Sequence, residues 1–176
     1  LENEKVTMMF SIPLTYTKMN DYVKENNVAV KHHLRFAITG GNILTSDRKK
    51  EIEKNLNVKL LDSYGLTETT ASVIMEYPNL KRKIGSIGKV ISGSSVQLWD
   101  ENGRELAPGQ IGEIVVKTTG MMSGYFRDDF TQSASFTDGW FHTGDLGYQD
   151  IEGYFFIVDR RKDMIKTLGF AVSPSE

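Results

Sequence analysis

Hydrophobic and polar residues follow two different patterns along this chain. Residues 14–27 (LTYTKMNDYVKENN) have the spacing of a helix, and residues 34–39 (LRFAIT) form the apolar run of a buried strand. The charged segment 47–57 is predicted to be a second helix, with Ser46 as its N-terminal cap. Residues 58–63 (VKLLDS) form another apolar run. This strand, helix and strand indicate a βαβ unit within a parallel sheet covered on both faces.

The pattern changes after about residue 85, where short β-type segments alternate with turns. The segments SVQLW (95–99), GEIVVK (112–117) and GYFFIV (153–158) are predicted strands, and DENGR (100–104) is a hairpin signal. The fold class is therefore α/β followed by a mainly β part. We expect the β part to be a small β-barrel or a meander.

Composition narrows the function without identifying it. With 176 residues, 39% apolar and 25% charged, the chain resembles an ordinary soluble protein of one domain or two small ones. A net charge of -2 without a broad basic field argues against nucleic acid as a partner. The chain has no cysteine, which excludes disulfides and fits a cytoplasmic location. No apolar run approaches the roughly 20 residues of a transmembrane segment.

The run DSYGLTETT (62–70), which follows the second apolar strand, has the chemistry of a ligand site. Ligands of open α/β sheets bind outside the carboxyl ends of the strands, so we expect this run to be a loop in such a crevice. Tyr64 offers a face for a planar base, Gly65 allows close backbone approach, Thr67 can donate to a phosphate, and Glu68 can hold Mg²⁺. Taken alone, the run could also be a turn and a helix start, with Thr67 as its cap.

Three further motifs accompany this run in a fixed order. GEIVVK…GMMSGY spans 112–125, WFHTGDLG (140–147) places Asp145 in a glycine-flanked turn, and GYFFIVDRRKDMIK (153–166) includes Arg160 at the end of a strand. Together with YGLTET, their order and spacing resemble the adenylate-forming (AMP-binding) superfamily of acyl- and aryl-CoA ligases, firefly-type luciferases and peptide-synthetase adenylation domains. The resemblance covers about residues 34–176.

The resemblance implies an ATP site. The loop GGNI (40–43) and the segment DSYGLT (62–67) would enclose the adenine, with Tyr64 as the stacking ring. Asp145 would accept hydrogen bonds from both ribose hydroxyls, and Arg160 would donate another to the ribose. The implied nucleotide-binding residues are Gly41, Asn42, Ile43, Asp62, Ser63, Tyr64, Gly65, Leu66, Thr67, Asp145 and Arg160.

The implied catalytic residues are Thr67, which would bind the α-phosphate, and Glu68, which would be the Mg²⁺ ligand. The activity implied for the whole protein is the activation of a carboxylic acid, fatty or aryl, as acyl-AMP. Coenzyme A would then accept the acyl group. Hydroxyl donors and Mg²⁺ suit this chemistry because negative charge gathers on the phosphoryl oxygens in the transition state.

The resemblance also implies a division of the chain. Residues 1–85 would be an α/β sheet portion carrying the adenine loops, and residues 86–160 a β-barrel-like subdomain. Residues 161–176 would contain the hinge, at Lys162, and the start of a C-terminal domain. No segment resembles the family's phosphate loop or supplies its adenylation lysine. We therefore expect N-terminal and C-terminal portions outside this chain, and we expect the chain alone to be inactive.

Local departures from the family pattern favour one branch. Leu66 and DMIKTLG (163–169) stand where peptide-synthetase domains usually have proline and a Q-V-K-I-R-G run, which favours a CoA ligase. Thr67 argues against fatty acyl-AMP ligases, which usually have alanine there. Asn42 replaces a usual alanine and could either reshape the acyl pocket or contact the base. A peptide-synthetase-type domain and a nucleotide-binding module without catalysis remain alternatives.

Several other residues are expected to be structural. His32 and His33 are expected to be solvated or capping side chains rather than metal ligands, and His142 to support its loop. The charged run 47–54 (DRKKEIEK) is expected to be a solvated helix face, with Lys50 and Lys54 opposed by glutamates. The residues expected to fill the β core are Tyr154, Phe155 and Phe156.

Overall fold

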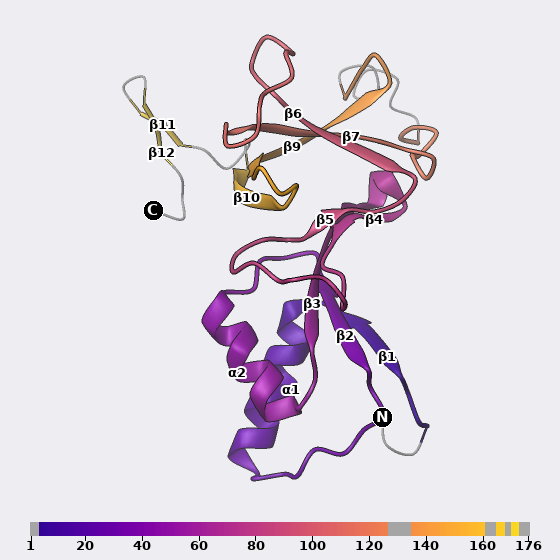
Figure 1. The fold of residues 1–176 in the computed structure, drawn as a ribbon, viewed down its shortest axis with the longest axis vertical. Helices are drawn as coiled ribbons and strands as arrows, with labels where there is room; N and C mark the ends of the chain where they lie inside the picture. Colours follow the sequence, from indigo (N-terminus) through magenta and orange to yellow (C-terminus); the bar gives the residue numbers. More distant parts are fainter. Residues whose placement is uncertain (1–3, 127–134, 161–164, 168–169, 173–176) are drawn as a thin grey trace.

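The computed structural model describes residues 4–126, 135–160, 165–167 and 170–172. Two larger sheets follow one another along the long axis of the molecule (Figure 1). We call them sheet A, built from the first half of the chain, and sheet B, built from the second half. None of the helices within these ranges has the length and apolar character of a membrane-spanning segment.

Sheet A has the strand order β1-β2-β3-β4-β5. Its first three strands are parallel, and the last two pair in antiparallel fashion. The strands are β1 (Met8–Ser11), β2 (Phe36–Gly40), β3 (Leu60–Leu66), β4 (Ala71–Met75) and β5 (Lys89–Val90). Helices α1 (Pro13–Glu25) and α2 (Ser46–Leu56) connect the parallel strands, so the predicted βαβ unit is confirmed.

Both helices lie on the same side of sheet A, next to each other (Figure 1). They bury an apolar cluster against that face, formed by Tyr16, Ala37, Ile52, Leu56, Val58 and Leu60. The expectation that both faces of the sheet are covered is therefore not met within the described residues. The reason is topological: two successive right-handed crossovers that step in one direction place both helices on one face. On the other face, the side chain of Phe10 is 61% exposed.

Helix α2 differs from its prediction at its start. Thr45, with φ -62° and ψ 146°, is the N-terminal cap, and Ser46 is the first helical residue. The prediction of Ser46 as the cap was wrong by one position, and no side chain caps the helix. The helix ends at Asn57, whose left-handed backbone conformation (φ 50°) stops further helical hydrogen bonding.

Strand β3 extends through the segment that was expected to be a loop. Tyr64 and Gly65 are strand residues, and the chain then reverses through one 3₁₀ turn, Thr67–Thr69, into β4. Close pairing of β3 and β4 explains the difference, because a Cβ atom on Gly65 would lie 1.8 Å from the carbonyl oxygen of Ala71. Glycine at this position is therefore what allows the two strands to meet.

Sheet B is an antiparallel, curled sheet with the strand order β10-β9-β7-β6, and β8 pairs with β9. Its strands are β6 (Ser94–Trp99), β7 (Gly112–Thr118), β8 (Phe136–Thr137), β9 (Trp140–Gln149) and β10 (Phe155–Arg160). The predicted meander-like β part is thus confirmed, and a turn forms in DENGR, where Gly103 N–H donates to Asp100 C=O at 3.1 Å. Near the C-terminus, β11 (Ile165–Thr167) and β12 (Phe170–Val172) form a separate hairpin.

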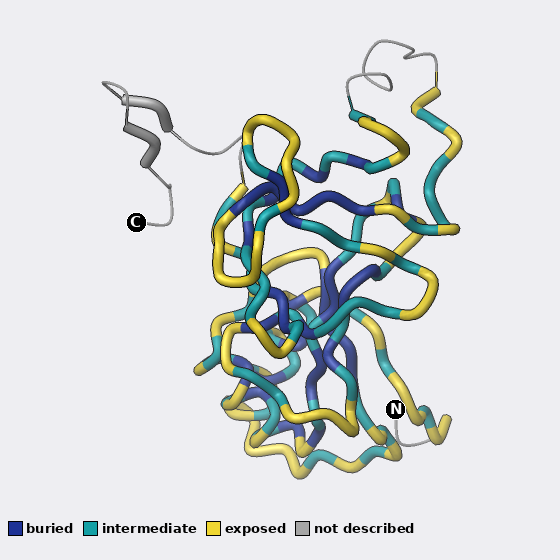
Figure 2. The backbone as a smooth tube through the Cα atoms, turned by 45° about the horizontal axis from the view of Figure 1, so that its top comes forward, coloured by how far each residue is buried: buried dark blue, intermediate teal, exposed yellow. Residues whose placement is uncertain are grey.

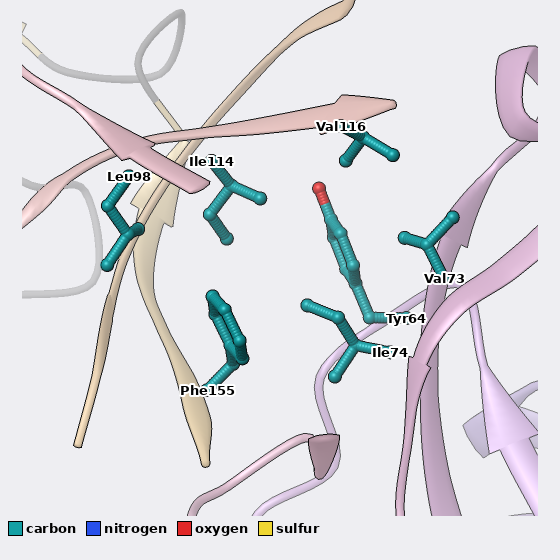
Figure 3. Packing of buried hydrophobic residues seen from close by; sticks show 7 residues of the cluster. All are labelled: Tyr64, Val73, Ile74, Leu98, Ile114, Val116 and Phe155. Carbon is teal, nitrogen blue, oxygen red and sulfur yellow. The ribbon is translucent and has the colours of Figure 1, made fainter. Parts of the chain in front are cut away.

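An apolar core joins the two sheets. Figure 3 shows its side chains pointing toward one another: Tyr64, Val73 and Ile74 come from sheet A, and Leu98, Ile114, Val116 and Phe155 come from sheet B. Buried segments concentrate in the strands, and exposed ones in the connecting loops (Figure 2). Tyr154 and Phe155 are buried as predicted. Phe156 is only half-buried and stacks on Tyr148 at 4.7 Å, so its prediction as a core residue was wrong.

Candidate functional site

The predicted nucleotide-binding residues, far apart in sequence, line one cavity of about 940 Å³. The cavity includes the carboxyl ends of β2 and β3, the loop after β2 and the end of β10. All eleven implied nucleotide-binding residues and Glu68 contribute to its lining: Gly41, Asn42, Ile43, Asp62, Ser63, Tyr64, Gly65, Leu66, Thr67, Glu68, Asp145 and Arg160. Lys162, the predicted hinge residue, lies outside the described residues.

Asp145 is held at the cavity by contacts to both of its carboxylate oxygens. Tyr64 OH donates to Oδ2 at 2.7 Å, and Arg160 Nε forms an ion pair with Oδ1 at 3.2 Å. The backbone N–H of Asp145 donates to Thr143 Oγ1 at 3.0 Å. Asp145 is only 9% exposed, so its carboxylate is fixed in position before any ligand binds.

The backbone around Asp145 is a strand with an irregular register, whereas a turn was predicted. Residue 145 belongs to β9, and the pairing of β9 with β7 shifts between Glu113 and Val115. Gly144 takes φ +74° at this irregularity, a conformation that glycine adopts without strain. The predicted turn was therefore wrong, because the long-range pairing with β7 makes the segment a strand.

Tyr64 is almost fully buried, with 9% exposure, and belongs to the core between the sheets. Burial, followed by the negative charge of Asp145, raises the pKa of its hydroxyl far above the ordinary value of 10. Its hydroxyl therefore stays protonated and donates to Asp145 at neutral pH. Tyr64 also lines the cavity, and the stacking role of its ring stays a prediction.

Thr67 and Glu68 lie on the 3₁₀ turn, and their side chains are more accessible than that of Asp145. One oxygen of Glu68, Oε1, accepts a hydrogen bond from Tyr125 OH at 2.8 Å. Within the described ranges, no group of three or more His, Cys, Asp or Glu side chains is arranged to hold a metal. Protein sites for Mg²⁺ commonly use one or two carboxylates and complete the shell with phosphate oxygens and water, so a lone accessible carboxylate fits this ion.

The loop after β2 brings backbone close to the cavity. Gly41 has φ +82°, and a Cβ atom on Gly40 would lie 2.9 Å from the carbonyl oxygen of Ser63. The side-chain oxygen of Asn42 accepts a hydrogen bond from the N–H of Ile43 at 2.8 Å, so it folds back onto its own loop. Ile43 is 70% exposed. Gly40 thus allows β2 to lie close to the backbone of β3, and Gly41 allows the left-handed conformation that begins the loop.

The sequence interpretation missed a cluster of charged side chains that lines the cavity, which we call the floor cluster: Lys49, Asp62, Glu76 and Arg82. Lys49 Nζ lies 2.5 Å from Asp62 Oδ2 and 2.5 Å from Glu76 Oε2. Arg82 Nε lies 3.2 Å from Glu76 Oε1. Burial raises the pKa of Asp62, and the charge of Lys49 opposes that shift.

The floor cluster corrects the prediction that residues 47–54 form a solvated helix face. Lys49 is only 7% exposed, and Glu51 pairs with Lys24 and Arg48 rather than with Lys50 or Lys54. A signal was present in the sequence: Lys49 precedes Ile52 and Leu56 at helical spacing, on the apolar stripe that faces the sheet. Its carboxylate partners come from β3 and the end of β4, which no local pattern connects.

The histidines make local structural contacts. His32 Nε2 lies 2.9 Å from the carbonyl oxygen of Leu56, and the N–H of Leu34 donates to its Nδ1 at 3.0 Å. His142 lies 3.2 Å from Glu113 Oε2 and 3.0 Å from Thr137 Oγ1. The contact with Leu56, the last residue of α2, agrees with a capping role for His32, and the contacts of His142 agree with its predicted support of the loop.

One cavity oxygen has an unused hydrogen-bonding capacity. Thr39 Oγ1 is buried and lacks a hydrogen-bond partner among the described residues, and Thr39 lines the cavity. Buried polar atoms are rarely left without partners, because each one costs about 1–3 kcal/mol.

Comparisons with known proteins agree with the geometry. Residues 1–126 match the family model described as AMP-binding enzyme. The crotonobetaine/carnitine–CoA ligases of Salmonella typhimurium (strain LT2) and Salmonella heidelberg (strain SL476) are each 41% identical over 147 residues. That match covers 81% of this chain, and the chain spans only about 28% of the length of these relatives.

Solved structures of CoA ligases have the same fold over nearly the whole chain. O-succinylbenzoate coenzyme A synthetase from Bacillus subtilis, in complex with ATP and magnesium, matches with a TM-score of 0.84 and 30% identity. The match covers 98% of this chain and 35% of that protein. An anthranilate CoA ligase in complex with anthranoyl-AMP matches with a TM-score of 0.86, 25% identity, and coverage of 98% and 33%. Together with the family model, these likenesses establish that the chain belongs to the AMP-binding enzyme family.

Proposed function

We propose that this chain carries the nucleotide site of an ATP-dependent acid–thiol ligase. The complete enzyme would activate a carboxylic acid, fatty or aryl, as acyl-AMP and transfer the acyl group to coenzyme A. The observation that carries the proposal is the cavity, because residues from motifs spread over positions 41–160 converge on it. The named relatives support this reaction class, since they are ligases that join carboxylic acids to coenzyme A.

Asp145 is the group that we assign to the ribose. A carboxylate oxygen accepts more than one hydrogen bond, so the contacts to Tyr64 and Arg160 leave acceptor capacity on both oxygens. Two vicinal hydroxyls present two donors at a spacing that a carboxylate can accept. The side chain of Arg160 is 57% exposed, and its guanidinium has donors left for the sugar.

Thr67 and Glu68 are assigned to the phosphate end of the nucleotide. Attack by the acid carboxylate on the α-phosphate concentrates negative charge on the phosphoryl oxygens. A hydroxyl donor at that position stabilises the transition state more than the ground state, which is the requirement for catalysis. Bound Mg²⁺ would supply further charge neutralisation, and the accessible carboxylate of Glu68 is the group suited to hold it.

The test uses the longest natural polypeptide that contains this chain. We expect carboxylate-dependent exchange of labelled pyrophosphate into ATP, followed by thioester formation when coenzyme A is added. Exchange without thioester formation would favour a peptide-synthetase-type domain. Nucleotide binding without exchange would favour a binding module, and the absence of both would contradict the proposal.

The 176-residue chain should not catalyse the exchange by itself. Orientation of reactants contributes about 7–11 kcal/mol to such steps, and no segment here resembles the family's phosphate loop. Robust exchange by the purified 176-residue chain would contradict this expectation. The cytoplasmic location expected from the sequence is part of the same proposal.

A further inference from the structure

The loop between β4 and β5, residues 76–88, connects the two sheets. It leaves sheet A, crosses to sheet B and returns to sheet A (Figure 1). At its far end, the N–H of Ile87 and the hydroxyl of Ser86 donate to the carbonyl oxygen of Phe155 in β10, at 3.0 and 2.9 Å. Several loop residues, from Arg82 to Ile87, also line the cavity.

Arg82 ties this loop to the side of sheet A. Its Nη1 donates to Glu53 Oε1 on α2 at 2.7 Å, and its Nη2 donates to the carbonyl oxygen of Leu60 on β3 at 3.0 Å. Its Nε donates to Glu76 Oε1 at the end of β4 at 3.2 Å. One planar guanidinium therefore joins three elements, which fixes both its position and its direction.

The next residue, Lys83, ties the loop to sheet B. Its ammonium pairs with Asp150 and with Glu152 Oε1, the latter at 2.7 Å. It also lies 4.7 Å from the ring centroid of Tyr154. These partners belong to the turn between β9 and β10. Arg160, the last residue of β10, lines the cavity. The side chains of Lys83 and Asp150 are only 22% and 21% exposed, so solvent screens their attraction less than that of a surface pair.

Two consecutive cations thus hold opposite sheets. The sheets also meet through the apolar core, the backbone hydrogen bonds of Phe155 and the hydrogen bond from Tyr64 to Asp145. Apolar contacts are not directional, so the angle between the sheets depends on the polar contacts. We propose that Arg82 and Lys83 are positioning residues that together set the separation of the two sheets at the cavity. They would thereby fix the distance between the Tyr64 side and the Arg160 side of the site.

The chain contains no cysteine, which allows a direct measurement of the sheet separation. Spin labels at Lys54→Cys on α2 and Ser95→Cys on β6, both exposed positions, would report the separation by double electron–electron resonance. The measurement uses the longest natural polypeptide, with any cysteine outside this chain replaced by serine. We expect a narrow distance distribution in the labelled parent and a broader one in Arg82→Ala/Lys83→Ala.

Matched variants distinguish a loss of sheet positioning from a general destabilisation of the fold. Lys81→Ala removes the same charge from an exposed neighbour in the same loop and should keep the narrow distribution. Lys83→Arg keeps the charge and should restore most of the order lost in Lys83→Ala. If Arg82→Ala fails to fold, the comparison of Lys83→Ala with Lys83→Arg still decides the question. A double variant whose distribution matches the parent would overturn the proposal, as would equal broadening in Lys81→Ala.

The catalytic consequence rests on the proposed function and has its own readout. In the double variant, we expect the KM for ATP to rise several-fold with a smaller change in kcat, and saturating ATP to narrow the distance distribution again. A broadened distribution in a protein that binds no ATP would keep the positioning role and reject the nucleotide site. Normal ATP binding with an unchanged distance distribution would keep the nucleotide site and reject the positioning role.

Discussion

Two groups of residues that line the cavity, which we call its two ends, use charge in opposite ways. At one end, the floor cluster pairs every charge with a neighbour: Lys49 bridges Asp62 and Glu76, and Arg82 also contacts Glu76. At the other end, which we call the mouth, Thr67 is exposed, Glu68 is half-exposed, and the side chain of Arg160 is 57% exposed. The same cavity therefore has a saturated end and an end with free capacity.

This difference follows from the cost of burying charge. A charge removed from water persists only if a partner replaces the lost solvation, so the floor cluster must satisfy itself, and the loss of one member leaves the others without compensation. Groups at the mouth keep part of their solvation and can exchange it for ligand contacts. Asp145 lies between these cases, because it is buried and partnered but retains acceptor capacity. Substitutions at the two ends should therefore affect different quantities, stability at the floor and chemistry at the mouth.

The largest expected effect is on stability, at the floor. Lys49→Met should lower the free energy of unfolding by about 3–5 kcal/mol, because it leaves two carboxylates without their buried cation. Lys50→Met is the matched control, since that side chain is 63% exposed and should tolerate the change. Urea-induced unfolding of both variants gives the measurement. Equal losses in the two variants would contradict the claim that the buried partners of Lys49 depend on its charge.

The next effect is on ATP use, at Asp145. Asp145→Ala should reduce kcat/KM for ATP at least tenfold, because hydrogen bonds to a charged group are worth about 1.5–3 kcal/mol each. Asp145→Asn should fall between the parent and the alanine variant. Steady-state kinetics with varied ATP provides the measurement in the longest natural polypeptide. An alanine variant with unchanged kinetic constants would remove Asp145 from the site.

A smaller and more selective effect is expected at the mouth. Glu68→Gln keeps the shape of the side chain but removes the charge that Mg²⁺ prefers, so adenylation should slow several-fold and need more Mg²⁺. Thioester formation from preformed acyl-adenylate should not change, because it needs no ATP-bound metal. Both half-reactions are measured across a Mg²⁺ titration. Equal effects on both half-reactions would contradict the metal-ligand role of Glu68.

The smallest expected effect on stability concerns an exposed ion pair, which serves as a reference for the buried floor cluster. Hydrogen bonds from Lys24, then from Arg48, lower the pKa of Glu51 from 4.5 to about 2. A carboxyl group whose pKa is lower in the folded state stabilises the fold above pH 4.5 and loses that contribution as the pH falls toward 2. Glu51→Gln should therefore reduce the loss of stability over this range, whereas Asp47→Asn, at a side chain 97% exposed, should not. Urea midpoints across the range test this difference, and parallel curves for the parent and Glu51→Gln would contradict it.

Local sequence determined part of the secondary structure of this protein and the residues of its candidate site. The two helices and five of the strands, β2, β3, β6, β7 and β10, follow from sequence pattern, and the predicted nucleotide-binding residues converge on one cavity. Such features depend on neighbouring residues, because hydrophobic spacing, glycine positions and functional side chains act within one segment. Family membership could be inferred for the same reason, from four short motifs in order.

Only the tertiary structure decided how those segments meet. Asp145 is a strand residue because β7 pairs with its strand, β9, and Lys49 is buried because carboxylates from two other elements solvate its charge. The side of the sheet that the helices cover likewise depends on strand order rather than on either helix. In each case the deciding contact joins residues far apart in the sequence, and no local pattern encodes such a contact.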